Sequence, residues 1–278
     1  MTEAEFIAAL RTLPLHAGAQ GLLDDAAVLE IGGETLVLTH DAVAEGVHYK
    51  PGTDPADIAW KLVAVNLSDL AAKGAEPIGV LIGATLVEGA ERFVEGLREV
   101  LTEYAVPLLG GDTIASKGPA TFGCTAIGRT AAAPLRTGAR PGDALWVTGH
   151  IGAASRDFAT GGPAYRRPRP RLAEGRALAP YVHAMMDVSD GLLLDAARMA
   201  EASGCTVDIS SRLVPLADGI DTRTAMTWGD DYELLFAAPT DWTPPFPATR
   251  IGAVQAKGAA PVLLDGAPPA FPLGYLHV

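Results

Sequence analysis

Hydrophobic and polar residues alternate along the first half of the chain in a pattern that predicts short strands and amphipathic helices. Residues 26–31 and 34–41 are two apolar runs separated by Gly32 and Gly33, which predicts a β-hairpin. The hydrophobic pattern of the rest of this half predicts helices at residues 2–11, 54–73 and 91–104, and strands at residues 78–86 and 121–128. Residues 106–113 predict a further apolar strand, followed by two glycines that let a ligand approach the backbone and then by Asp112. After the first helix the expected order is β-β-α-β-α-β-β, which indicates an α+β fold.

The expected helix at residues 54–73 carries the clearest functional signal. It begins with the pair Asp54-Pro55, an N-cap followed by the residue that favours a first helical turn, and it ends before a glycine. Apolar residues cover most of its circumference, so we expect it to be buried. One polar stripe nevertheless runs along it, formed by Asn66, Asp69 and Lys73. Because unpaired buried charge is costly, this stripe must face a partner, a ligand or a cavity, and we favour Asp69 as a ligand.

A turn-rich stretch at residues 136–143 divides the chain. We place the domain boundary there, with an N-terminal α/β domain at residues 1–135 and a C-terminal α/β domain at residues 136–278. The second half is expected to contain a helix at residues 192–203 and strands at residues 144–147, 249–254 and 261–264. The fold class that follows is α+β, with mixed β-sheets flanked by helices.

Composition agrees with a folded protein of about two domains. The chain has 278 residues, of which 49% are hydrophobic and 19% are charged. It lacks the run of about 18 apolar residues that a membrane helix needs, and its start lacks the pattern of a secretory signal. Two cysteines are too few for a disulfide framework. We therefore expect a cytoplasmic location and no membrane partner.

The net charge of −12 restricts the ligands that the protein can bind. It argues against nucleic acid, whose phosphates would be repelled. An anionic small substrate would be repelled as well, unless a divalent metal reverses the charge where carboxylates gather. A basic run at residues 166–171 is either a solvated loop or a patch that faces phosphate.

Aspartates recur at the ends of expected elements and on the polar stripe. They are Asp24, Asp25, Asp41, Asp69, Asp112, Asp187, Asp190, Asp230 and Asp231. Asp41 is expected to end the second hairpin strand and to flank a loop together with His48. Carboxylate ligands without His or Cys partners suit magnesium. The chain lacks both the phosphate-binding loop of P-loop kinases and the protein-kinase motifs. These residues predict a magnesium-dependent enzyme acting on a nucleotide or a phosphate ester.

Motifs along nearly the whole chain resemble those of the thiamine-monophosphate kinase family. In the family's order they are Asp24-Asp-Ala-Ala27, Thr39-His-Asp41, Glu45-Gly-Val-His48, Trp60-Lys61, Val65 to Pro77, Gly110-Gly-Asp-Thr113, Arg136 to Asp143, Pro168 to Arg171, Asp187 to Leu192 and Asp231 to Leu234. Each motif alone is weak, but the ordered set is specific. The resemblance implies the two-domain fold of aminoimidazole ribonucleotide synthetase and a homodimer formed through the N-terminal domain.

The resemblance also implies an activity and a set of residues. The enzyme would transfer the ATP γ-phosphate to thiamine monophosphate, giving thiamine diphosphate, without a general base because the acceptor phosphate is largely ionised. Magnesium (Mg2+) would be held by Asp25, Thr39, His40, Asp41, Asp69, Asp112, Asp187 and Asp190, with Asp41, Asp69 and Asp112 as the catalytic residues. ATP would contact Gly111, Asp112, Arg136 and Ser189. Thiamine monophosphate would contact His48, Asp230 and Tyr275.

The chain departs from the family pattern in several places. The departures are Leu23, His40, Ile114, Trp228 and Asp230, together with a shortened stretch at residues 149–171. They keep alternatives open: another ATP-dependent enzyme of the superfamily, such as an aminoimidazole ribonucleotide synthetase-like enzyme, a magnesium-dependent phosphatase, or a non-catalytic nucleotide-binding relative.

Overall fold

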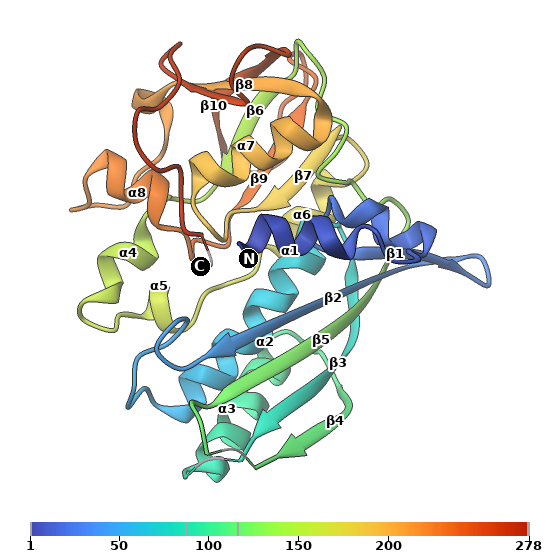
Figure 1. Ribbon diagram of the computed structural model, residues 1–278, viewed down its shortest axis with the longest axis vertical. Helices are drawn as coiled ribbons and strands as arrows, with labels where there is room; N and C mark the ends of the chain where they lie inside the picture. Colours follow the sequence, from blue (N-terminus) through green and yellow to red (C-terminus); the bar gives the residue numbers. More distant parts are fainter. Residues whose placement is uncertain (1, 87, 116, 277–278) are drawn as a thin grey trace.

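Two β-sheets, one in each half of the chain, form the frame of the protein (Figure 1). The computed structural model describes residues 2–86, 88–115 and 117–276. The last strand of the first sheet ends at Thr130 and the first strand of the second begins at Ala144. The expected α+β class with mixed sheets flanked by helices is confirmed. The boundary between residues 135 and 136 stays a prediction.

The N-terminal sheet has the strand order β1-β2-β5-β3-β4. Its strands are β1 (Ala27–Ile31), β2 (Glu34–Ala44), β3 (Glu76–Thr85), β4 (Leu108–Ile114) and β5 (Thr121–Thr130). The expected hairpin is confirmed, since β1 and β2 pair antiparallel across Gly32 and Gly33. The helices α2 (Pro55–Ala72) and α3 (Ala90–Glu103) cover one face of this sheet (Figure 1). The edge strand β4 is exposed along its whole length.

The long helix α2 joins the two domains. Asp54 caps its start by accepting a hydrogen bond from the Ala56 amide, and all its residues except Pro55 and Trp60 are buried, as the sequence predicted. Leu70 of α2 belongs to the same hydrophobic cluster as Met185 from the second sheet. Because this core is continuous across both domains, α2 fixes their relative position and carries its polar stripe to the junction.

The second sheet has the order β11-β8-β10-β6-β9-β7. Its strands are β6 (Ala144–Thr148), β7 (Ala184–Asp187), β8 (Cys205–Ile209), β9 (Leu234–Ala238), β10 (Ala248–Ala256) and β11 (Val262–Leu264). The helices of this half are α4 (Ala153–Phe158), α5 (Pro163–Arg166), α6 (Leu172–Leu178), α7 (Leu192–Ser203) and α8 (Thr222–Trp228), with a short 3-10 turn η2 (Ser211–Leu213). Helix α7 matches its predicted bounds and packs against β7 and β8. The short helices and the strands β7 and β8 were not predicted, and the helices contain too few apolar periods for a prediction.

The N-terminal segment lies between the two domains (Figure 1). It forms helix α1 (Glu3–Leu10) and the 3-10 segment η1 (Ala17–Leu22). The predicted capping box of α1 is present, with Thr2 and Glu5 exchanging hydrogen bonds. Within the described residues, none of the helices is both long and apolar enough to cross a membrane.

Two strands extend further than the sequence suggested. The prediction that Asp41 ends its strand was wrong, since β2 continues to Ala44 and Asp41 pairs with Cys124 of β5. Asp112 likewise lies inside β4, opposite Gly83 of β3. In both cases a neighbouring strand supplies ladder hydrogen bonds, and this pairing overrides the turn preference of aspartate and glycine.

Candidate functional site

A cavity of about 730 Å³ opens between the two domains. Its wall includes residues from the loop before β1, from β2, from α2 and from the segments that follow β7 and α8. The sequence-predicted site residues that line it are Asp25, Asp41, His48, Asp69, Arg136, Asp187, Ser189, Asp190, Asp230 and Tyr275. This volume is in the range of ordinary small-molecule sites, and residues distant in the sequence therefore share one cavity.

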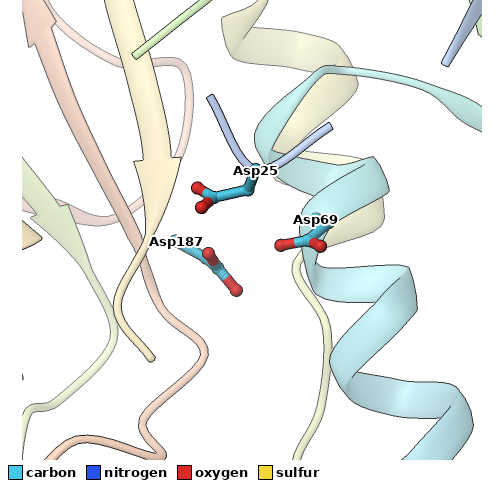
Figure 2. Close-up of side chains that lie close together, drawn as sticks. All are labelled: Asp25, Asp69 and Asp187. Carbon is cyan, nitrogen blue, oxygen red and sulfur yellow. The ribbon is translucent and has the colours of Figure 1, made fainter. Parts of the chain in front are cut away.

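Three aspartates form the centre of the site. Figure 2 shows Asp25, Asp69 and Asp187 directed toward one another from three separate segments. Asp25 precedes β1, Asp69 lies on α2 and Asp187 is the last residue of β7. One carboxylate oxygen from each lies within 4.8 Å of the others. An oxygen-only set at this separation suits a hard divalent cation such as magnesium.

The surrounding hydrogen bonds hold these carboxylates in place. The buried Thr39 hydroxyl donates to Asp69, so Thr39 stands behind this carboxylate and not on the cavity wall. Ser68, the neighbour of Asp69 on α2, donates its hydroxyl to Asp187 Oδ2 at 2.5 Å. Asn66 accepts the Asp41 amide at 2.9 Å. The expectation that the polar stripe of α2 meets partners is confirmed: Asn66 contacts Asp41, Asp69 contacts Thr39, and Lys73 contacts Asp24.

The acids raise one another's pKa values. Burial, followed by the negative charge of Asp25, raises the pKa of Asp187 to about 8. Burial also raises the pKa of Asp41 to about 6, with a further contribution from Asp25. The pKa of Asp69 lies well above its ordinary value, first through burial and then through the charge of Asp41. Repulsion of this kind is relieved by a bound cation.

Basic side chains stand at the edge of the acid group. The fully buried Lys73, which follows α2 directly, contacts Asp24 Oδ1 at 2.5 Å. Asp24 and Lys73 therefore form a buried structural ion pair. Arg136 pairs with Asp25. Desolvation would raise the pKa of Asp25, but the charges of Arg136 and Lys73 outweigh it and hold that pKa below its ordinary value. Asp25 therefore differs from Asp41, Asp69 and Asp187, whose pKa values are raised.

Sequence reasoning did not assign a role to two residues that shape the loop after β7. Asp195 is fully buried and accepts the backbone amides of Ser189 and Asp190, both at 3.0 Å. Arg198, one turn further along α7, contacts Asp190 at 2.5 Å and Asp195 at 3.1 Å. Their spacing of three residues on a predicted helix was the available signal, although such pairs are common on helix surfaces.

Aromatic rings gather in another part of the cavity wall, the aromatic end of the cavity. Phe158, Tyr165, Trp228 and Tyr232 line it together with Asp230. The rings of Phe158 and Trp228 lie 4.9 Å apart, and the Tyr232 hydroxyl donates to Asp230 Oδ1 at 2.8 Å. The His48 ring accepts the Ala44 amide at 3.1 Å and so shapes its own loop. Rings beside a carboxylate can accommodate a flat cationic group.

Besides Thr39, three predicted site residues do not reach this cavity. They are His40, Gly111 and Asp112. Side chains alternate along a strand, so His40 lies on the opposite face from Asp41, where it contacts Thr125 at 2.8 Å. Gly111 admits the neighbouring strand instead of a ligand, since a Cβ there would lie 1.8 Å from the Ile82 carbonyl oxygen. Asp112 is exposed on β4, three strands from β2, or roughly 14 Å at ordinary strand spacing.

The basic run at residues 166–171 mostly engages carboxylates. Arg166 contacts Asp57 at 2.7 Å, and Arg171 contacts Glu233 at 2.5 Å. Arg167 pairs with both Asp57 and Glu99. No residue of this run is part of the cavity wall as described, so the interpretation as a phosphate-facing patch is not supported. Through Arg166 and Arg167 the run links the second domain to α2 and α3 by ion pairs.

Comparison with known proteins gives consistent matches over most of the chain. Residues 23–130 match the family "AIR synthase related protein, N-terminal domain", and residues 140–241 match the corresponding C-terminal domain. The thiamine-monophosphate kinase of Escherichia coli (strain K12) is 36% identical over 247 residues, covering 79% of this chain and 76% of that protein. That of Rhodopirellula baltica is 34% identical, covering 99% and 97%. A solved structure described as AaThiL complexed with AMPPCP and TMP superposes with a TM-score of 0.89 at 29% identity, covering 100% and 97%.

Proposed function

This chain belongs to the thiamine-monophosphate kinase family, and we propose that it transfers the γ-phosphate of ATP to thiamine monophosphate, giving thiamine diphosphate. The observation that carries this function is the group Asp25, Asp69 and Asp187, which two domains bring together at the wall of one cavity. The match to a solved relative described with an ATP analogue and TMP supports both substrates.

We propose that the acid group binds magnesium. Asp25, Asp69 and Asp187 would hold it, and Asp41 and Asp190, which line the same cavity, would hold any further ion. When bound, magnesium neutralises the charge of the phosphates during transfer. The fit rests on the donor set: three carboxylate oxygens within 4.8 Å of one another, with burial and mutual repulsion raising the pKa values of Asp69 and Asp187.

We propose that Arg136 and Ser189 contact the ATP phosphates, next to the acids. Among the described residues the Arg136 Nε is buried without a hydrogen-bond partner, although its Nη2 pairs with Asp25. A phosphate oxygen would satisfy this donor. Ser189 stands in the loop that Asp195 holds through two backbone amides, so its hydroxyl is presented to the cavity from a fixed backbone.

The acceptor would occupy the aromatic end of the cavity. Its cationic ring suits the rings of Phe158 and Trp228 together with the carboxylate of Asp230, and Tyr275 and His48 complete the wall. Its phosphate is already ionised near neutral pH, so no side chain needs to remove a proton from the attacking oxygen. The residues of this end therefore act by binding and orienting the acceptor.

We propose that the enzyme works as a homodimer through the N-terminal sheet. Support comes from exposed apolar side chains on the edge strand β4 and on its neighbour β3: Ile78, Leu81, Leu108, Leu109 and Ile114. The positions of His40 and Asp112 add to this. Across the sheet, Ala42 pairs with Gly123, Gly123 with Gly83, and Gly83 with Asp112. Paired residues share a face of the sheet, and Ala42 shares its face with His40, two residues earlier. Asp112 therefore lies on the same outer face as His40, away from the cavity of its own chain. A second copy packed on this face would supply its Asp112 to the site of the first.

We also propose a cytoplasmic location. The cysteines Cys124 and Cys205 are free and buried, which is usual where thiols stay reduced. Burial raises the pKa of the Cys124 thiol to about 12, so it is a poor nucleophile and metal ligand.

A product assay tests the proposed function. The purified protein is incubated with magnesium, ATP and thiamine monophosphate, and the products are identified by mass spectrometry. We expect thiamine diphosphate and ADP in equal amounts. Free phosphate without thiamine diphosphate would indicate a phosphatase, and ATP binding without turnover would indicate a non-catalytic relative. Asp69→Asn should abolish turnover with the fold intact, whereas Asp218→Asn, at an exposed position of the second domain, should not.

A further inference from the structure

Lys61 of α2 is a buried lysine whose ammonium group has partners in three separate segments. Its side chain is only 3% exposed. The ammonium group lies 2.8 Å from Asp230 Oδ2 and donates to the His48 carbonyl oxygen at 3.0 Å. It also lies 4.1 Å from the centre of the Tyr165 ring. The charge is therefore fully engaged inside the protein.

These contacts join the parts of the chain that form the aromatic end of the cavity. His48 follows β2 in the first domain, whereas Tyr165 and Asp230 belong to the second. The Tyr165 hydroxyl donates to the same His48 carbonyl at 3.1 Å, which closes the cluster. One buried cation thus links both domains at the place where the acceptor would bind.

The carboxylate of Asp230 is held at both oxygens. Lys61 holds Oδ2 at 2.8 Å, and the Tyr232 hydroxyl donates to Oδ1 at 2.8 Å. The backbone of Asp230 is left-handed, with φ at 59°, so the residue stands in a defined turn and not in a strand. Its side chain is 22% exposed and lines the cavity, whereas Lys61 itself does not line it. Lys61 can therefore influence a ligand through Asp230 without touching it.

Stability alone does not account for this arrangement. A buried ion pair is often no more stabilising than apolar residues of similar size, because both charges lose their water. The pair does fix the direction of a carboxylate that would otherwise rotate at the cavity wall. On the basis of the proposed function, we infer that Lys61 is a positioning residue of the acceptor site, which orients Asp230 toward thiamine monophosphate.

The test compares substrates and variants. Steady-state kinetics and calorimetric titration with thiamine monophosphate are measured for the wild-type enzyme, Lys61→Met, Asp230→Asn and the double variant. Lys257→Met, at an exposed position of the second domain, is the matched control. We expect Lys61→Met to raise the KM for thiamine monophosphate at least about tenfold and to leave the KM for ATP within about twofold. Because Lys61 acts through Asp230, the double variant should match Asp230→Asn, and the two single effects should not multiply.

Three results would overturn the inference. They are an unchanged KM for thiamine monophosphate in Lys61→Met, an equal rise for both substrates, or multiplication of the single effects in the double variant. If Lys61→Met does not fold, the double variant, which has no unpaired buried charge, still gives the comparison with Asp230→Asn. A wild-type enzyme that binds thiamine monophosphate without phosphorylating it would refute the proposed function only, and the dissociation constants would then decide on Lys61. A wild type that fails to bind it would refute both.

Discussion

Replacing Asp187 with asparagine should stabilise the metal-free protein and abolish its activity at the same time. Asp187 is 2% exposed, and burial together with the charge of Asp25 raises its pKa to about 8. Asparagine has nearly the same shape and can still accept the Ser68 hydroxyl, but it carries no charge. The substitution therefore removes repulsion from the folded state without opening a cavity.

The size and sign of the effect follow from the pKa. An aspartate whose pKa is raised by folding favours the folded state below the unfolded pKa of 3.8, and this contribution is lost as the pH rises to about 8. At neutral pH, roughly 3 pH units above the unfolded value, the upper limit is ~4 kcal/mol at about 1.4 kcal/mol per unit. Since Asp25 shares the repulsion, we expect about half of this, ~2 kcal/mol.

Urea unfolding in the presence of a chelator measures this effect between pH 5 and pH 8. The difference in unfolding free energy between Asp187→Asn and the wild type should grow with pH toward ~2 kcal/mol. Asp218→Asn, at an exposed position, should show no such trend. The product assay with magnesium should find Asp187→Asn inactive. A variant that is less stable than the wild type at pH 8, or one that retains full activity, would refute the reasoning.

Three further predictions concern other parts of the site. Lys73→Met should lower the free energy of unfolding by about 3–5 kcal/mol in urea experiments, because it leaves the buried Asp24 carboxylate without its cationic partner. A loss below about 1 kcal/mol would contradict this. Asp69→Asn and Asp112→Asn should each be inactive alone, but mixing equal amounts with subunit exchange should restore about a quarter of wild-type turnover. Half of the dimers in the mixture then contain one intact site of two. No recovery of turnover would argue against a shared site. Trp228→Gly should raise the KM for thiamine monophosphate about tenfold in steady-state kinetics and leave that for ATP unchanged, since it removes one ring of the aromatic wall.

Local chemistry made most of the fold predictable from the sequence. The cap at Asp54 and the glycine after Lys73 delimit α2 almost to the residue, and the Gly32-Gly33 turn marks the first hairpin. Prediction failed where the outcome depends on a neighbour distant in the sequence. Asp41 and Asp112 look like strand ends in isolation, yet both lie inside strands because adjacent strands continue the ladder.

The same limit explains which parts of the site could be anticipated. The polar stripe on α2 predicts that Asp69 needs a partner, because helix geometry alone places it on a buried face. Nothing local indicates that Lys61 has its partner in Asp230, 169 positions further along the chain. That pairing requires the second domain to fold against α2, so it belongs to the tertiary structure.

The position of Asp112 also depends on residues distant in the sequence. On its own chain Asp112 lies on an exposed strand, on the face opposite the cavity, where its charge has no evident use. An exposed acid and exposed apolar side chains on one edge strand have a common explanation if a second copy covers that strand. The apolar side chains would then be buried by the partner, and each Asp112 would lie near the acids of the other chain. A site divided in this way makes assembly a condition of activity, because neither chain alone would complete the ligand set.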